Sequence, residues 1–403
     1  MALSQSAQEM IATQSAPPCA SNVGVTPAGV AHGSPTLLDT IQAVAGCFDA
    51  LALSLPIAGH QRHAIVAAQY AVDCRRSLWK ANPELAARSL GASLVHLGRL
   101  LASGGELKAA ARITQEGVDV SRAQAEVHHD DNLPELASWL IDLSARQSEC
   151  RYRDRAIESA EEACRLYRRV AGNSEGQWLD LLAASLENLG VRLSESASMD
   201  AALEAMHQGM RICRDRAHGD REGTQARLAS ILTRTGEVLR ASDRSEEARP
   251  LIQEAIHLWR IRLPKDPVGS APGLASSLSA LSDVLAEQLQ WVDALAARRE
   301  SVEVYRLLAG VNPERFEYEL ASALHRMGRQ SLNANHVEEA IACSTEAASM
   351  RRALAAGGRD DHAAELLRTL ELLAEALNQA GRRDEAEKIR EEGAVRHRRL
   401  FEE

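Results

Sequence analysis

The sequence repeats itself with a period of 46 residues. Alanine occupies eight positions at this unbroken spacing, and we call these residues the phase alanines: Ala64, Ala110, Ala156, Ala202, Ala248, Ala294, Ala340 and Ala386. Self-similarity at a fixed period of this length is typical of a solenoid, in which each period is one supersecondary unit stacked on the next. A solenoid keeps one continuous core however long it grows, so a chain of 403 residues does not require several globular domains.

Each period contains two helical patterns. Leucine stands 16 and 20 residues before the phase alanine in the second to eighth repeats, as Leu94 and Leu90 do before Ala110, and this spacing places one apolar stripe on a first helix, helix A. A second helix, helix B, carries the phase alanine itself. A small residue lies twelve positions before each phase alanine and allows the two helices to approach closely: Ala52, Gly98, Ser144, Gly190, Gly236, Ser282, Gly328 and Ala374.

Composition agrees with an all-α chain. Hydrophobic residues make up 45% of the sequence but aromatic residues only 3%, so the core must consist of small and aliphatic side chains that favour helix. We therefore predict a right-handed α-solenoid of eight antiparallel helix pairs over residues 35–403. Residues 1–34, rich in Ala, Ser, Pro and Gly, have the composition of a disordered leader.

Charge and cysteine usage restrict the environment and the partners. The net charge of −10 disfavours a nucleic-acid-binding protein, which normally has a basic excess. Seven scattered cysteines without a CxxC pair favour a reducing compartment, and five of them within helical patterns are expected to be buried: Cys47, Cys74, Cys164, Cys213 and Cys343. No signal peptide is evident, and the apolar stretch 37–57 is interrupted by Asp39 and Asp49, so we expect no membrane span and a cytoplasmic location.

The pattern resembles the tetratricopeptide repeat (TPR). In the TPR a large residue is followed by Leu-Gly and then by two alanines seven residues apart. Leu324, Met327-Gly328, Ala340 and Ala347 fall on those positions, as do Leu186, Leu189-Gly190, Ala202 and Gly209 in an earlier copy. The period is about a dozen residues longer than in the common 34-residue repeat, and Arg replaces the closing Pro. The chain is thus most similar to the long-repeat, kinesin-light-chain-like branch of the family.

The resemblance implies that ligands lie along a concave face lined by helix A. Two positions of helix A, one and five residues after the second core leucine, map to that face. Their charged or polar members are the candidate binding residues: Arg99, Glu187, Glu237, Asp283, His325, Arg329, Glu371 and Glu375. The Lys/Asn carboxylate clamp of chaperone-binding members is not visible, although Arg99 and Arg329 could each hold a carboxylate.

Arginine also recurs in every copy, twelve residues after the phase alanine. We call these residues the arginine ladder: Arg76, Arg122, Arg168, Arg214, Arg260, Arg306, Arg352 and Arg398. A functional interpretation is a cationic track for an acidic peptide or for phosphates. The structural interpretation, which we favour, is that each arginine packs on the next repeat and caps carbonyls or pairs with a carboxylate, because the interfaces of a solenoid need identical contacts.

No motif in the sequence indicates catalysis or a cofactor. There is no P-loop, GxSxG or HExxH sequence. His128-His129-Asp130-Asp131 lies in a loop between repeats without a second ligand pair, so a solvated loop is favoured over a metal site. We therefore expect a chain that is not an enzyme and that holds neither metal nor cofactor.

The two ends of the array differ. The last helix, 383–401, is heavily charged, whereas the first, 37–55, carries only Asp39 and Asp49 and is apolar nearly all round. An apolar helix of this kind is expected to be covered. Residues 1–34, a second copy of the chain or another protein could cover it; we expect a partner contact or a homodimer through the first repeat, because a two-fold contact needs no second surface.

These patterns predict a non-catalytic protein-interaction scaffold or adaptor that binds a partner protein or peptide on the concave helix A face. The alternative is a regulatory sensor module that binds a short peptide or small anionic ligand and signals to a partner.

Overall fold

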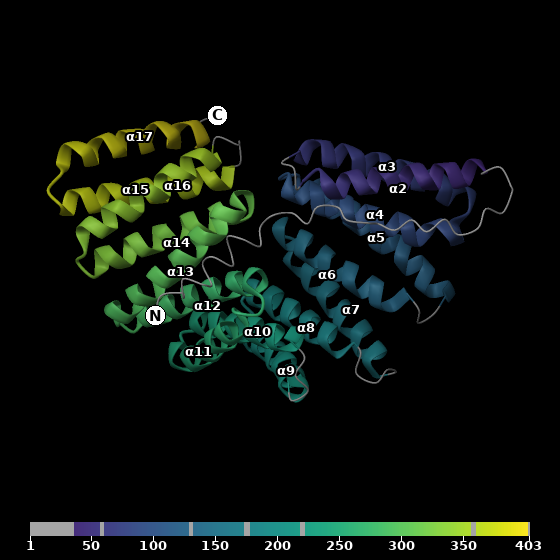
Figure 1. Cartoon of the computed structure of the whole chain (residues 1–403), viewed down its shortest axis with the longest axis horizontal. Coiled ribbons are helices and arrows are strands. Elements are labelled where there is room, and N and C mark those ends of the chain that lie inside the picture. Colours follow the sequence, from purple (N-terminus) through teal and green to yellow (C-terminus); the bar gives the residue numbers. More distant parts are fainter. Residues whose placement is uncertain are drawn as a thin grey trace. The chain divides into compact units, whose positions relative to one another are not determined.

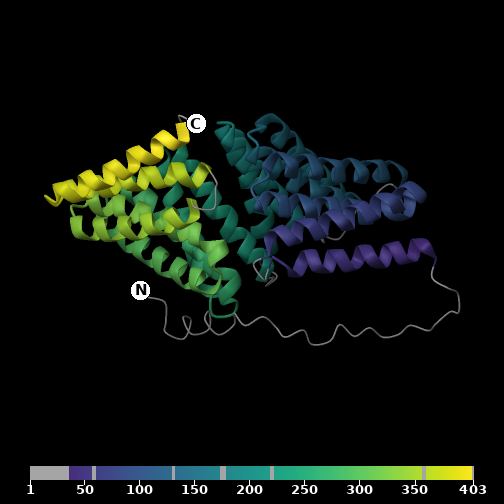
Figure 2. The same cartoon turned by 90° about the horizontal axis from the view of Figure 1, so that it is seen from above.

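The computed structural model describes residues 36–56, 60–128, 132–172, 178–217, 222–355 and 360–401 (Figure 1, Figure 2). Every element in these ranges is a helix, and the described residues contain no strand. The prediction of an all-α helical repeat is confirmed. The leader predicted for residues 1–34 lies outside the described residues.

The described helices form two compact units. In each unit, successive helices lie side by side and are in contact (Figure 1). The N-terminal unit contains α2 (Leu37–Ser54), α3 (Gln61–Ala81), α4 (Pro83–Ser103), α5 (Leu107–His128), α6 (Leu133–Glu149), α7 (Arg153–Gly172), α8 (Leu179–Glu195) and α9 (Met199–Ala217). The C-terminal unit contains α10 (Glu222–Ala241), α11 (Ser245–Arg262), α12 (Pro267–Glu287), α13 (Trp291–Val311), α14 (Pro313–Asn333), α15 (Val337–Ala355), α16 (Asp360–Gln379) and α17 (Arg383–Phe401).

Even-numbered helices are therefore helix A of each repeat, and odd-numbered helices are helix B. The sequence phase runs through both units, with four repeats in each. Continuity of the solenoid over 35–403 and its right-handedness stay predictions.

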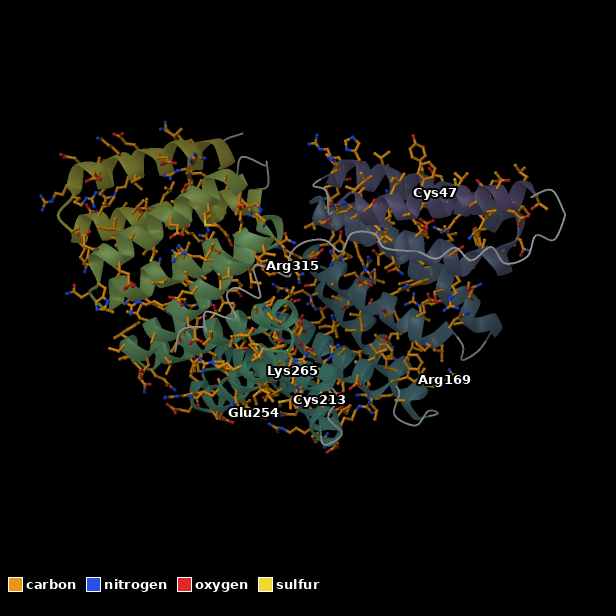
Figure 3. All side chains as sticks on the ribbon, in the orientation of Figure 1. Cys47, Arg169, Cys213, Glu254, Lys265 and Arg315 are labelled. Atoms are coloured by element: carbon orange, nitrogen blue, oxygen red, sulfur yellow. The ribbon has the colours of Figure 1, made fainter. Side chains whose placement is uncertain are left out.

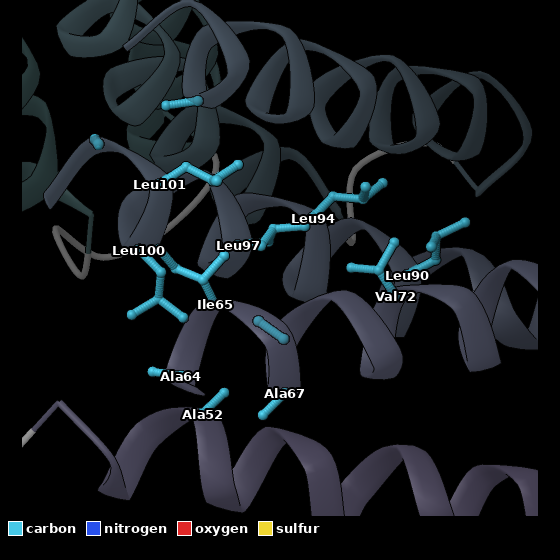
Figure 4. Close-up of a cluster of buried hydrophobic side chains, with 13 residues drawn as sticks. Ala52, Ala64, Ile65, Ala67, Val72, Leu90, Leu94, Leu97, Leu100 and Leu101 are labelled. Carbon is cyan, nitrogen blue, oxygen red and sulfur yellow. The ribbon is translucent and has the colours of Figure 1, made fainter. Parts of the chain in front are cut away.

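The phase alanines form the seam between helix A and helix B. All eight are buried, with at most 1% of their surface exposed. The small residue of helix A lies opposite: a Cβ added to Gly236 would come within 2.4 Å of Ile252 on the next helix, and one added to Gly190 within 2.6 Å of Met206. Figure 4 shows the same arrangement in the first repeat, where Ala52 of α2 and Ala64 of α3 lie in one cluster with leucines of α4. The predicted register is confirmed.

The turns between helix A and helix B also repeat. In the second to eighth repeats the residue five positions before the phase alanine has a positive φ: Gly105, Arg151, Ala197, Asp243, Leu289, Asn335 and Gly381. The next backbone N–H donates to a carbonyl five residues earlier, as Gln290 does to Leu285 at 2.9 Å and Arg382 to Leu377 at 2.8 Å. This is the left-handed C-terminal motif that satisfies the last carbonyls of a helix.

Within each unit, the arginine ladder joins one helix B to the next. Five members bond a glutamate 40 residues further on: Arg76 to Glu116, Arg122 to Glu162, Arg260 to Glu300, Arg306 to Glu346 and Arg352 to Glu392. Arg168 donates instead to the amide oxygen of Gln208 at 3.0 Å. The predicted pairing with a carboxylate of a neighbouring repeat is confirmed for these five members.

Helix α2 buries few of its residues against α3. Only Ala45 and Ala52 are buried, while Leu37, Leu38 and Leu53 expose 76%, 44% and 60% of their surface. The exposed apolar surface predicted for the first helix is therefore present. By length and mean hydropathy, 1.3 over 18 residues, α2 could also cross a membrane, so the absence of a membrane span stays a prediction.

The cysteines within the helices differ in their burial. Cys164, Cys213 and Cys343 are buried as predicted. The prediction was wrong for Cys47, which is exposed on α2 (Figure 3), and for Cys74, which is half-buried. Cys47 is exposed because α2 buries only its alanine side against α3.

Candidate functional site

A hollow of about 470 Å³ lies on the helix A face of the C-terminal unit. Its walls come from α10, α12, α14 and α16, with three side chains reaching in from α13 and α15. Its floor consists of small side chains: Ser276, Ser279 and Ala280 of α12, and Ser322 and Ala323 of α14. Ser276 and Ser322 both stand 18 residues before a phase alanine, a position that also holds a small residue in the five repeats before them. Small side chains on adjacent helices thus leave room for a ligand.

Arg298 lies beneath this floor with none of its side chain exposed. It stands four residues after a phase alanine, where the other repeats before the last have only uncharged residues: Ala68, Thr114, Ala160, Met206, Ile252 and Ser344. Its Nη2 bonds Asp283, its Nε donates to Gln330 Oε1 at 3.3 Å, and its Nη1 has no hydrogen-bond partner in the described part of the chain. Burial lowers the pKa of this guanidinium. Such a buried charge is tolerated only with a close counter-ion, here Asp283.

Asp283 accepts from two arginines at once. Arg298 bonds one carboxylate oxygen from within the core, and Arg326 of α14 bonds the other from the surface, with 56% of its side chain exposed. Arg326 could leave this contact while Asp283 and Arg298 remain paired, and an exposed ion pair contributes only about 0–1 kcal/mol. Arg326 is therefore free to bind an anion.

Arg351 is a second buried arginine beside the hollow, 5% exposed on α15. It donates to the backbone oxygen of Glu365 at 2.9 Å and to Thr369, and it forms a 3.4 Å ion pair with the Glu365 carboxylate. Burial lowers its pKa. The Tyr318 hydroxyl donates to Glu365 at 2.8 Å, so this carboxylate is held from two sides.

Two lining residues of opposite charge have no counter-ion within the described ranges. Glu319 of α14 forms no ion pair with a described residue, and its buried Oε2 has no hydrogen-bond partner among them. Arg368 of α16 is exposed and likewise forms no ion pair within the described ranges. The Tyr305 hydroxyl remains neutral at pH 7, because burial and the nearby Glu319 carboxylate raise its pKa to about 12.

His325 lies between these charges. Burial, followed by the guanidiniums of Arg351, Arg329, Arg326 and Arg368, lowers its pKa to about 4. Its Nδ1 lies 3.2 Å from the Thr369 hydroxyl of α16. Asp283 of α12 lines the same hollow. The imidazole is therefore neutral at pH 7, and the positive charge around it comes from arginines.

Solved structures with the same architecture were found at low sequence identity. BtubC (BKLC) from P. vanneervenii is 17% identical over 62% of this chain and 92% of its own, with a TM-score of 0.50. RapI is 13% identical over 78% of this chain and 99% of its own, also with a TM-score of 0.50. The TPR-like repeats of a putative kinesin light chain from Podosopora anserina are 17% identical over 56% and 99%, at 0.45. The fold is a TPR-like helical repeat.

At these identities the likeness establishes the fold and nothing more. No protein-family model matches the sequence. No curated protein matches it either.

The TPR-like array brings some of the predicted site residues together. Glu237, Asp283 and His325 line the hollow, and Arg329 lines an adjoining one of about 360 Å³ with Asp283 and His325. These four residues therefore lie close to one another, while their role in binding stays a prediction.

The other four predicted residues lie elsewhere. Glu371 lines a separate hollow with α17 residues, and Glu375 is exposed on α16. Arg99 and Glu187 belong to α4 and α8 of the N-terminal unit, where Arg99 forms a 2.5 Å ion pair with Asp142. None of the four lines this hollow.

Sequence reasoning missed the residues that enter from helix B and from the neighbouring positions of helix A: Arg298, Tyr305, Arg351, Glu319, Arg326 and Arg368. Two signals were available: Arg298 breaks a column of uncharged residues, and Arg368 stands 18 residues before its phase alanine, where the seven earlier repeats have a small residue. For Arg326 no such signal existed, since the sequence does not say which surface charges surround a hollow.

Metal-ligating side chains do not gather in the described ranges: no group of three or more His, Cys, Asp or Glu residues there could hold an ion. His129, Asp130 and Asp131 of the predicted polar loop lie outside those ranges.

Proposed function

We propose that this chain is a non-catalytic interaction scaffold that binds a peptide segment of a partner protein on the helix A face of the C-terminal unit. The observation that carries the proposal is the hollow itself. It combines a floor of small side chains with charged walls anchored by two buried arginines, Arg298 and Arg351.

This arrangement suits a peptide better than a reacting substrate. The two buried guanidiniums are held by Asp283 and Glu365 and present fixed charge rather than a titrating acid or base. Serine hydroxyls on the floor could bond a peptide backbone, while exposed arginines in the walls could bond acidic side chains. The TPR-like fold supports the same class of function.

Selection from a random peptide library displayed on phage, with the full chain as bait, tests the proposal. Ser276→Trp fills the hollow from its floor and should weaken the selected peptides at least tenfold, as measured by fluorescence anisotropy. Ala184→Trp places the same side chain at the equivalent repeat position of α8 and should leave binding unchanged. A library without binders, or binders indifferent to Ser276→Trp, would contradict the proposal.

The second candidate is a sensor that binds a small anionic ligand. The observation that favours it is the group of four arginines around His325. Purification of the chain followed by mass spectrometry separates the two: a stoichiometric protein partner supports the scaffold, whereas a ligand removed by dialysis supports the sensor.

A further inference from the structure

The charges that line the hollow are balanced. Four guanidiniums, those of Arg298, Arg326, Arg351 and Arg368, face four carboxylates: Glu237, Asp283, Glu319 and Glu365. The whole chain, by contrast, has a net charge of −10. A balanced site in an acidic protein is adapted neither to a simple anion nor to a simple cation.

Most of these charges already have partners. Asp283 bonds Arg298 and Arg326, Glu365 pairs with Arg351, and Glu237 forms a 3.0 Å ion pair with Arg234. One charge of each sign remains unpaired within the described ranges, Glu319 and Arg368.

The Glu319 carboxylate has the stronger need for a partner. Its Oε2 is buried without a hydrogen bond in the described part of the chain, although an unsatisfied buried acceptor is destabilising, and more so when it is charged. Burial and the nearby Glu319 carboxylate raise the pKa of the Tyr305 and Tyr318 hydroxyls, so both are neutral groups. A ligand ammonium or guanidinium would supply the missing donor.

Arg368 offers the complementary charge. It lies on α16, the helix A of the repeat that follows α14, which carries Glu319. Its guanidinium is exposed and can take a carboxylate with two parallel hydrogen bonds. Arg326 can add a further bond, because Asp283 keeps Arg298 when Arg326 moves.

We propose that the hollow selects a peptide segment with one basic and one acidic residue, the basic one bound by Glu319 and the acidic one by Arg368 with Arg326. This inference rests on the proposed function and names its ligand class. A purely acidic peptide would meet the Glu319, Glu365 and Glu237 carboxylates. A purely basic peptide would meet the arginines, and it would also bind elsewhere on a chain with net charge −10.

The test uses the peptides selected on the full chain and four charge versions of the tightest one: the parent, the basic residue changed to Gln, the acidic residue changed to Gln, and both changed. Affinities are measured against the full chain and against Glu319→Gln and Arg368→Gln. Glu338→Gln on α15 and Arg383→Gln on α17, two exposed charged residues of the same unit that do not line the hollow, are matched controls. Circular dichroism verifies that each variant is folded.

We expect Glu319→Gln to weaken the parent peptide about three- to tenfold, the range of a partly buried ion pair, and to leave the peptide without its basic residue unaffected. Arg368→Gln should act in the same way on the acidic residue alone. The control variants should bind all four versions of the peptide with unchanged affinity.

The inference would be overturned if the selected peptides lacked the basic and the acidic residue. It would also be overturned if Glu319→Gln and Arg368→Gln weakened all four charge versions of the peptide equally. Both results leave the proposed function intact, provided that Ser276→Trp still abolishes binding. If Ser276→Trp left peptide binding unchanged, the proposed function itself would be contradicted. The two failures are therefore distinguishable.

Discussion

At the scale of single residues, the turns between helix A and helix B require a left-handed backbone conformation that several of the residues found there do not favour. Seven turns place a residue at positive φ, yet only Gly105 and Gly381 are glycine. Leu289 has a φ of 58° and exposes 71% of its surface. A left-handed conformation costs a non-glycine residue about 1–2 kcal/mol.

Leu289→Gly should therefore stabilise the C-terminal unit by about 1 kcal/mol, after the larger loss of backbone entropy for glycine is subtracted. Urea unfolding followed by circular dichroism measures the change. Leu289→Ala keeps the strained φ and serves as the control. A destabilising effect of Leu289→Gly would contradict the turn geometry.

His325 gives a prediction about pH. Its pKa is about 4 in the folded chain and about 6.5 when unfolded, so between these values the unfolded chain binds the extra proton. Stability due to this group is complete above pH 6.5 and is lost as the pH falls towards 4. His325→Gln should flatten this part of the stability profile, and NMR titration of the ring should give a pKa well below 6. A pKa near 6.5 would contradict the buried, arginine-rich surroundings.

The fold was more predictable than the site, for a physical reason. Packing between repeats demands the same small or apolar residue in every copy, so the phase alanines and the core leucines reveal themselves by repetition. A binding site occurs once, so repetition does not mark its residues: Glu319 shares its repeat position with a glutamate in only two other repeats, as Glu135 and Glu365. The left-handed conformation was also hidden at three of the turns, because Arg151, Ala197 and Leu289 are not turn-forming residues.

At the scale of elements, the arginine ladder connects successive helices B within each unit. The Arg306–Glu346 pair joins α13 to α15, with both side chains partly exposed. The glutamate stands six residues after the phase alanine in six repeats, a column that could have been found in the sequence together with the arginines.

A double-mutant cycle on Arg306→Ala and Glu346→Ala should give a coupling energy of about 0.5 kcal/mol, reduced at high salt because the pair is exposed. Peptide affinity, measured on the folded variants, should not change. If the variants kept their stability but lost peptide binding, the arginine ladder would be the binding site and the hollow would not.

At the scale of the whole molecule, α2 exposes more large apolar side chains than any other helix described. Leu37, Leu38, Val44, Leu51 and Leu53 are all exposed on it. Apolar surface of this kind usually marks an interaction site, and a two-fold contact between copies closes without further growth.

We predict that the full chain is a dimer at micromolar concentration in analytical ultracentrifugation, and that Leu38→Gln with Leu53→Gln makes it monomeric without loss of helicity. Val292→Gln with Leu289→Gln removes two exposed apolar side chains of the C-terminal unit and is the control. A strictly monomeric parent would refute the dimer. Binding of the parent, but not of the variant, to lipid vesicles would assign α2 to a membrane instead.

The central claim is that a peptide binds in the hollow between α12, α14 and α16. Photo-crosslinking of a selected peptide that carries a benzophenone group to the full chain, with the sites located by mass spectrometry, tests it most directly. The account predicts crosslinks within residues 276–283, 318–326 and 365–368, and their loss in Ser276→Trp. Crosslinks on α2, or on the arginine ladder, would contradict it.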